Sequence, residues 1–287
     1  MRIGIWYTLL NLVLNVILIR GMGPIPALGT TGAALGTVIA GALVSAYTLA
    51  LFFRGREVIV FERAMPWRPD WRIIGELFRF GLPAGIQGVA MNVGGVLLLR
   101  FVGSLELSAE AQAAYTVSYT QLFSLVTWTS VGLMGAAATV AGQSLGAEQP
   151  ERSVEGVRVA AGIGVAGAVL VGLAFLGVPN LLLGVFGMED PAVVELSVEL
   201  LRYLAISGLF ITVALTYTGG LQGTGDTTSP LYISIVSQVV IPVGMCALIQ
   251  AMRGLEPGDI WLAIVLGHAT RCVLSVARFR QQKWRGI

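Results

Sequence analysis

Long apolar stretches separated by short polar segments follow one another along the whole chain. Most are roughly 17 to 25 residues long, which as a helix is enough to cross about 30 Å of hydrocarbon. The short alternating segments typical of a membrane β-barrel do not occur. The pattern therefore predicts an all-α integral membrane protein with about eight transmembrane helices. The predicted spans are Ile3–Ile19, Ala33–Phe53, Gly81–Val102, Ala113–Val140, Val157–Gly177, Tyr203–Leu221, Leu231–Met252 and Ile260–Ala277.

The longest polar stretch, residues 54–79, mixes arginines with acidic residues and separates two spans from six. Within it, Trp71–Phe78 has an amphipathic pattern and predicts a helix lying on the inner membrane surface before the next span. We therefore divide the chain into residues 1–56, a linker at 57–80 and a six-helix unit at 81–287.

Composition agrees with a membrane protein, because 55% of the residues are hydrophobic, 12% are charged and the mean hydropathy is +0.80. A net charge of +2 is too small to indicate a nucleic-acid partner. Membrane lipid, in contrast, is an obligatory partner of a chain with these apolar spans. No enzyme motif, metal-ligand cluster or phosphate loop is present, so we expect neither catalysis nor a cofactor nor a bound metal.

Arginines cluster between the second and third spans, and basic residues also follow the last span. By the positive-inside rule this distribution places both termini in the cytoplasm, which an even number of spans requires. The expected location is the plasma membrane, which for a bacterium is the inner membrane.

Polar residues at membrane depth are candidates for function, because burying them without a partner is costly. Asn11 and Asn15 lie four residues apart on one helix face, and with Thr37 they could present oxygens to a cation. The alternative is that the three side chains simply form hydrogen bonds between helices.

A second group of polar and large side chains is spread over several spans and could line a substrate cavity, together with the aromatic residues Tyr115 and Phe123. Each could equally join helices. The candidates are Gln87, Met91, Asn92, Tyr119, Gln121, Trp128, Thr216 and Gln238. In the last span, His268 could be protonatable, and we expect Arg271 to extend toward the cytoplasmic interface.

Two strings carry a family resemblance. One follows the fourth span and contains Gly142, Gln143, Gly146 and Ala147; the other follows the sixth and contains Gly223, Gly225, Asp226, Thr227 and Pro230. The chain resembles the multidrug and toxic compound extrusion transporters over essentially its whole length, from that family's fifth helix onward. The glycine-rich turn around Asp226 also suits a helix joint, with Asp226 as a cap.

The resemblance implies a fold of two six-helix lobes that exports organic, often cationic compounds in exchange for protons or sodium. This chain would hold the last two helices of the first lobe and a complete second lobe. Asn11, Asn15 and Thr37 would be the coupling site, although the carboxylate expected near Asn15 is an amide here. Met91 stands where another branch has a carboxylate.

Two alternatives remain open. A flippase for lipid-linked saccharides would need more basic residues at membrane depth than Arg100 and Arg271 provide. A chain that does not transport by itself would need a partner chain supplying four further helices.

Overall fold

The computed structural model describes residues 2–24, 26–54 and 68–286, and the described chain is helical apart from its turns. Eight of its helical segments are long and apolar enough to cross a membrane, which confirms the predicted fold class. The helices are α1 (Arg2–Arg20), α2 (Gly29–Phe53), α3 (Trp71–Val102), α4 (Ser108–Tyr115), η1 (Thr116–Leu122), α5 (Ser124–Gly146), α6 (Pro150–Gly177), α7 (Pro179–Gly184), α8 (Pro191–Gly223), α9 (Thr228–Ile235), η2 (Val236–Val240), α10 (Ile241–Arg253), α11 (Pro257–Arg280) and η3 (Lys283–Gly286).

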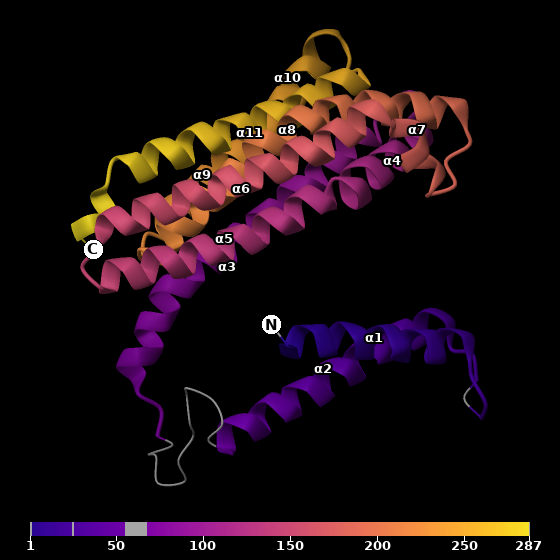
Figure 1. Ribbon diagram of the computed structural model, residues 1–287. Helices are drawn as coiled ribbons and strands as arrows, with labels where there is room; N and C mark the ends of the chain where they lie inside the picture. Colours follow the sequence, from indigo (N-terminus) through magenta and orange to yellow (C-terminus); the bar gives the residue numbers. More distant parts are fainter. Residues whose placement is uncertain (1, 25, 55–67, 287) are drawn as a thin grey trace. The chain divides into compact units, whose positions relative to one another are not determined.

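The chain divides into two compact units, unit 1 at Met1–Asp70 and unit 2 at Trp71–Ile287. Unit 1 is the helical hairpin of α1 and α2 (Figure 1). The two helices approach closely because Gly36 on α2 faces Asn15 on α1; a Cβ at Gly36 would lie 2.2 Å from Asn15 Oδ1. Small residues at such crossings let helix backbones meet without large side chains between them.

The linker prediction for residues 57–80 falls partly on residues 57–67, which lie outside the described residues. The remainder differs from the expectation in one respect. Trp71–Phe78 is not a separate helix but the first two turns of α3, which continues past Gly81. Pro83 lies inside this helix and does not end it. A membrane helix tolerates such a proline because neighbouring groups can satisfy the freed carbonyl.

In unit 2, α8 lies at the centre and packs against α5, α6 and α11 (Figure 1). Its side chains Leu200, Leu201 and Leu204 are 1% exposed or less. Helices at the periphery instead keep apolar outer faces, as Leu170 and Leu173 of α6 show with exposures of 70% and 60%. Such faces suit contact with lipid tails, so α8 is the buried helix around which the others are arranged.

Gly219 and Gly223, the latter from the second string, fix how closely α8 approaches α5. A Cβ at Gly219 would lie 2.1 Å from the Met134 carbonyl oxygen, and one at Gly223 would lie 2.1 Å from that of Ala138. Only glycine fits at these points, because any Cβ would overlap backbone. The first string is part of the same contact, since a Cβ at Gly142 would meet the Gly223 carbonyl oxygen at 2.7 Å. The two family strings therefore meet at one end of unit 2.

Two spans contain π-helical turns, η1 and η2, which the hydrophobic pattern did not predict. In η1 the amide of Phe123 donates to the carbonyl of Ser118, five residues earlier, at 2.9 Å. The wider turn inserts one residue into the helix without ending it. The fourth predicted span is accordingly a composite of α4, η1 and α5.

Candidate functional site

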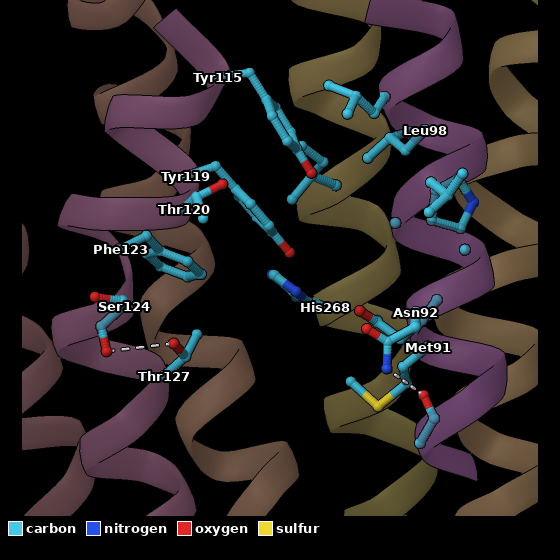
Figure 2. Close-up of a pocket in the computed structure, with 18 of the residues that line it drawn as sticks. Met91, Asn92, Leu98, Tyr115, Tyr119, Thr120, Phe123, Ser124, Thr127 and His268 are labelled. Carbon is cyan, nitrogen blue, oxygen red and sulfur yellow. Dashed lines mark hydrogen bonds between the residues drawn. The ribbon is translucent and has the colours of Figure 1, made fainter. Parts of the chain in front are cut away.

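A cavity of about 830 Å³ opens within unit 2. It is lined by α3 on one side and by η1 and α5 on the other, with η2, α10 and α11 completing the wall (Figure 2). Tyr115, Tyr119 and Phe123 stack along one wall, with ring centroids 4.9 and 5.6 Å apart. Residues four apart share one helix face, so α4, η1 and the residue directly after η1 present these rings as a continuous aromatic surface.

His268 of α11 lies between the two walls (Figure 2). Its ring stacks on Phe123 with a centroid distance of 5.9 Å, and its Nδ1 is hydrogen-bonded to the buried hydroxyl of Ser207 on α8. The side chain is 3% exposed. His268 is therefore held in one orientation by an aromatic ring on one side and a hydroxyl on the other.

Met91 and Asn92 of α3 form part of the opposite wall (Figure 2). Asn92 donates to the Gly88 carbonyl at 2.9 Å, and Met91 Sδ accepts a contact of 3.8 Å from Nη1 of Arg271. Arg271 is only 1% exposed, so the prediction that it extends to the interface was wrong. It lies one turn after His268 on the inward face of α11, and that face packs against α8 and α3.

Five of the eight predicted cavity residues line the cavity: Met91, Asn92, Tyr119, Trp128 and Gln238. Trp128 is 73% exposed and forms part of its open edge. The prediction missed Thr120 and Ser124, which the π turn η1 brings to the wall beside the tyrosines.

The other three predicted residues do not line the cavity. Gln87 is buried and donates to Ser234 at 2.8 Å. Thr216 is buried and donates to the Thr212 carbonyl, whereas Gln121 is exposed. Gln87 and Thr216 thus form hydrogen bonds within the helix bundle, as the alternative interpretation describes.

In unit 1, the three candidate coupling residues do lie together. Asn11 donates to Thr37 at 3.2 Å, Asn15 donates to Asn11 at 3.2 Å, and Thr37 donates to the Ala33 carbonyl at 3.1 Å. The Asn15 Oδ1 atom is buried and has no hydrogen-bond partner among the described residues. The three side chains therefore form hydrogen bonds, as the alternative interpretation expects. Asn15 Oδ1 remains as an oxygen acceptor without a donor among the described residues.

The residues of the two family strings form a joint. Asp226 accepts hydrogen bonds from the amide and hydroxyl of Ser229 at 3.0 and 2.8 Å, and these hold the first turn of α9. Arg278 of α11 donates to the same carboxylate through Nε and Nη2 at 2.9 and 2.8 Å. Gly225 has a φ of +94°, which favours glycine. Around this joint, Gln143, Gly146 and Ala147 are exposed, and Thr227 and Pro230 are buried.

Among the described residues, no group of three or more His, Cys, Asp or Glu side chains could hold a metal ion. The described residues that line the cavity likewise include no Asp, Glu, Lys or Arg. The cavity is thus an aromatic and polar chamber, with the Arg271 charge behind one of its walls.

A family model, MatE, matches residues 83–248, more than half of the chain and most of unit 2. The chain belongs to the MatE family. Similar curated proteins include a probable multidrug resistance protein NorM of Thermotoga maritima, 25% identical over 96% of this chain and 58% of the relative. Another, from Mannheimia succiniciproducens, is 30% identical over 94% of this chain and 58% of the relative.

Solved structures show the same MatE fold. A crystal structure of MATE in complex with MaL6 superposes with a TM-score of 0.88 at 19% identity, covering 99% of this chain and 63% of the other. A MOP superfamily transporter from Pyrococcus furiosus, described as having a binding pocket of reverse polarity, gives 0.87 at 21% identity, covering 98% of this chain and 61% of the other. The chain thus spans about three fifths of the length of these relatives.

Proposed function

We propose that this MatE family chain is a cation-coupled antiporter that exports small organic compounds across the membrane by alternating access. The observation that carries the proposal is the cavity of about 830 Å³ between membrane-spanning helices, with its stacked aromatic wall. Pockets for small organic ligands have volumes of about 300 to 1,000 Å³ and are mostly apolar with a few polar groups. The names of the NorM relatives support multidrug export.

For the coupling site we propose Asn11, Asn15 and Thr37. The unpartnered Asn15 Oδ1, the Thr37 hydroxyl and the Ala33 carbonyl beside it are oxygen donors of the kind that Na⁺ binds. Amides and hydroxyls do not titrate at physiological pH, so this trio by itself can exchange sodium but not protons. Of the two coupling ions that the family resemblance implies, the trio therefore favours sodium. Proton coupling would require a titratable group elsewhere, for which His268 is the candidate.

We also propose that the protein lies in the bacterial inner membrane with both termini in the cytoplasm, as the arginine distribution supports. That orientation puts the joint around Asp226 on the cytoplasmic side. Fusing an enzyme that is active only outside the cytoplasm to the C-terminus tests the orientation: the expected result is an inactive fusion.

The full chain, reconstituted in vesicles, should move a xanthene dye against an imposed Na⁺ gradient. Thr37→Val should reduce the Na⁺ dependence at least about tenfold, because a lost ligand to a bound ion costs more than about 1.4 kcal/mol. Thr8→Val is the matched control, since Thr8 bonds its own helix carbonyl in the same way but lies outside the trio. Folded protein that moves no dye under either a Na⁺ or a proton gradient would contradict the proposal.

Two other functions make different predictions in the same vesicles. A lipid-linked saccharide flippase would translocate a lipid-linked sugar without an ion gradient. A chain that requires a partner chain with further helices would be inactive alone and would gain activity when that chain is co-reconstituted.

A further inference from the structure

The strongest unexplained feature of unit 2 is the buried charge of Arg271. The side chain is 1% exposed, and no described carboxylate lies within ion-pair distance of it. Its Nε has no hydrogen-bond partner among the described residues, and Nη1 donates to the Met91 sulfur, a weak acceptor. A buried charge without a partner is strongly destabilising, so such residues within membrane spans point to a ligand.

A second unused donor lies on the same wall. Gln238 lines the cavity, and its Nε2 atom is buried without a partner in the described chain. Nε2 lies beside α11, 3.6 Å from the position of a Cβ on Gly267. Gly267 and Arg271 are four residues apart on that helix and so share one face, about 6 Å apart along its axis. The helix positions that carry or adjoin these two unsatisfied donors, Arg271 and Gly267, therefore lie about one helical turn apart.

The remaining polar groups do not offset this positive character. Neither Asp nor Glu occurs among the described lining residues. The wall near α11 thus offers a cation and N–H donors, but no fixed negative charge with which an organic cation could pair.

We propose that the cavity binds organic anions: an aromatic or apolar body lies against Tyr115, Tyr119 and Phe123, and an acidic group is bound by Arg271 and Gln238. The inference rests on the proposed role of the cavity as the substrate site, and it replaces the cationic substrate that the family resemblance implied. A guanidinium can bind a carboxylate, sulfonate or phosphate through two parallel hydrogen bonds.

Met91 controls access to this subsite. Its thioether lies on the cavity surface and contacts Nη1 of Arg271, so it covers the guanidinium. Methionine is unbranched and readily changes rotamer, and an entering acidic group can displace it. The contact with sulfur is replaced by charge-assisted hydrogen bonds, which are much stronger.

The test compares two dyes that share one xanthene frame, anionic fluorescein and the cationic methyl ester rhodamine 123, by fluorescence anisotropy on the full chain in nanodiscs. Fluorescein should bind at least about tenfold more tightly. Arg271→Gln should weaken fluorescein binding by about 10- to 100-fold and leave rhodamine binding unchanged or tighter. Arg100→Gln is the matched control, because Arg100 of α3 is exposed and lies outside the cavity lining.

Two further variants keep the test valid if Arg271→Gln does not fold. Arg271→Lys keeps the charge without the paired donors and should weaken fluorescein binding about three- to tenfold. Met91→Ala should strengthen it, because the guanidinium is uncovered, and damage to the fold cannot produce such a gain. Equal or tighter rhodamine binding by the unaltered protein, or unchanged fluorescein binding in the Arg271 variants, would overturn the inference.

Competition identifies the source of the acidic group. Displacement of fluorescein by farnesyl phosphate at lower concentrations than phenyl phosphate assigns the subsite to a lipid headgroup, and the reverse order assigns it to a soluble compound. The outcome is also separate from that of the transport proposal. Fluorescein binding that depends on Arg271, without gradient-driven dye movement, supports the anion subsite and refutes the antiporter. Gradient-driven rhodamine movement that is insensitive to changes at Arg271 supports the antiporter and refutes the anion subsite.

Discussion

The joint between α8, α9 and α11 should lose a measurable part of its stability when the Asp226 carboxylate is neutralised. That carboxylate accepts four hydrogen bonds, two from Arg278 and two from Ser229. The Asp226 side chain is 6% exposed and that of Arg278 is 27% exposed. The pair therefore lies between the fully buried and the fully exposed case.

The magnitude follows from these exposures. An exposed ion pair contributes about 0 to 1 kcal/mol, and breaking a fully buried one costs about 3 to 5 kcal/mol. Because Arg278 can turn to water once released, we expect Asp226→Asn to cost about 1 to 2 kcal/mol. Asp226→Ala also removes the acceptor for the Ser229 amide, a helix-capping interaction of about 1 kcal/mol, giving about 2 to 3 kcal/mol in total.

The assay is reversible unfolding of the full chain in mixed micelles, with the free energy of unfolding measured for Asp226→Asn, Arg278→Gln and the double variant. This double-mutant cycle isolates the free energy of interaction between Asp226 and Arg278, since each single change removes that interaction. We expect a coupling free energy of about 1 to 1.5 kcal/mol, reduced in high salt. Additive single changes would show that the carboxylate does not pair usefully with Arg278, and equal losses for Asp226→Asn and Asp226→Ala would show that it does not cap α9.

Three further outcomes are expected. Gly223→Ala should destabilise the protein by about 2 kcal/mol or more in the same unfolding assay, because its Cβ would lie 2.1 Å from a backbone oxygen; Gly135→Ala, which meets nothing within 4 Å, should cost nothing. Trp284→Ala should cost about 3 kcal/mol by loss of its stacking on Phe279 and of the bond from Nε1 to the Phe279 carbonyl, whereas Trp284→Phe should cost about 1 kcal/mol. Asn15→Asp should make Na⁺-driven dye movement in vesicles depend on pH, since it adds a titratable ligand to the trio; a pH profile identical to that of the unaltered protein would contradict this.

The number and order of the spans could be predicted from sequence because membrane insertion selects for long apolar runs, which remain visible without any tertiary information. The contact between Asn11, Asn15 and Thr37 was predictable for a related reason: two polar residues four apart share a helix face, and the next helix returns alongside. Asp226 as a cap was likewise visible in a turn rich in glycine and followed by proline.

Other features depend on tertiary packing, which the sequence pattern does not show. Arg271 lies near the end of a span, where an arginine usually reaches water, but its helix face is turned toward α8 and α3. Gln87 and Asn92 are both amides on α3, yet only Asn92 lines the cavity, because Gln87 is bonded to Ser234. Which polar residue meets another helix and which meets a cavity depends on the rotation of each helix about its axis.

The π turns η1 and η2 provide a way in which that rotation can change. Each holds one residue more than a regular turn, and cavity residues lie within them, Tyr119 in η1 and Gln238 in η2. Expelling the extra residue would turn the helix beyond it by about 100° and shorten it by about 1.5 Å. In η1 such a change would carry Trp128 from the open edge of the cavity to another side of α5. One extra residue in each of two helices is thus enough to change which side chains line the cavity while every helix remains intact.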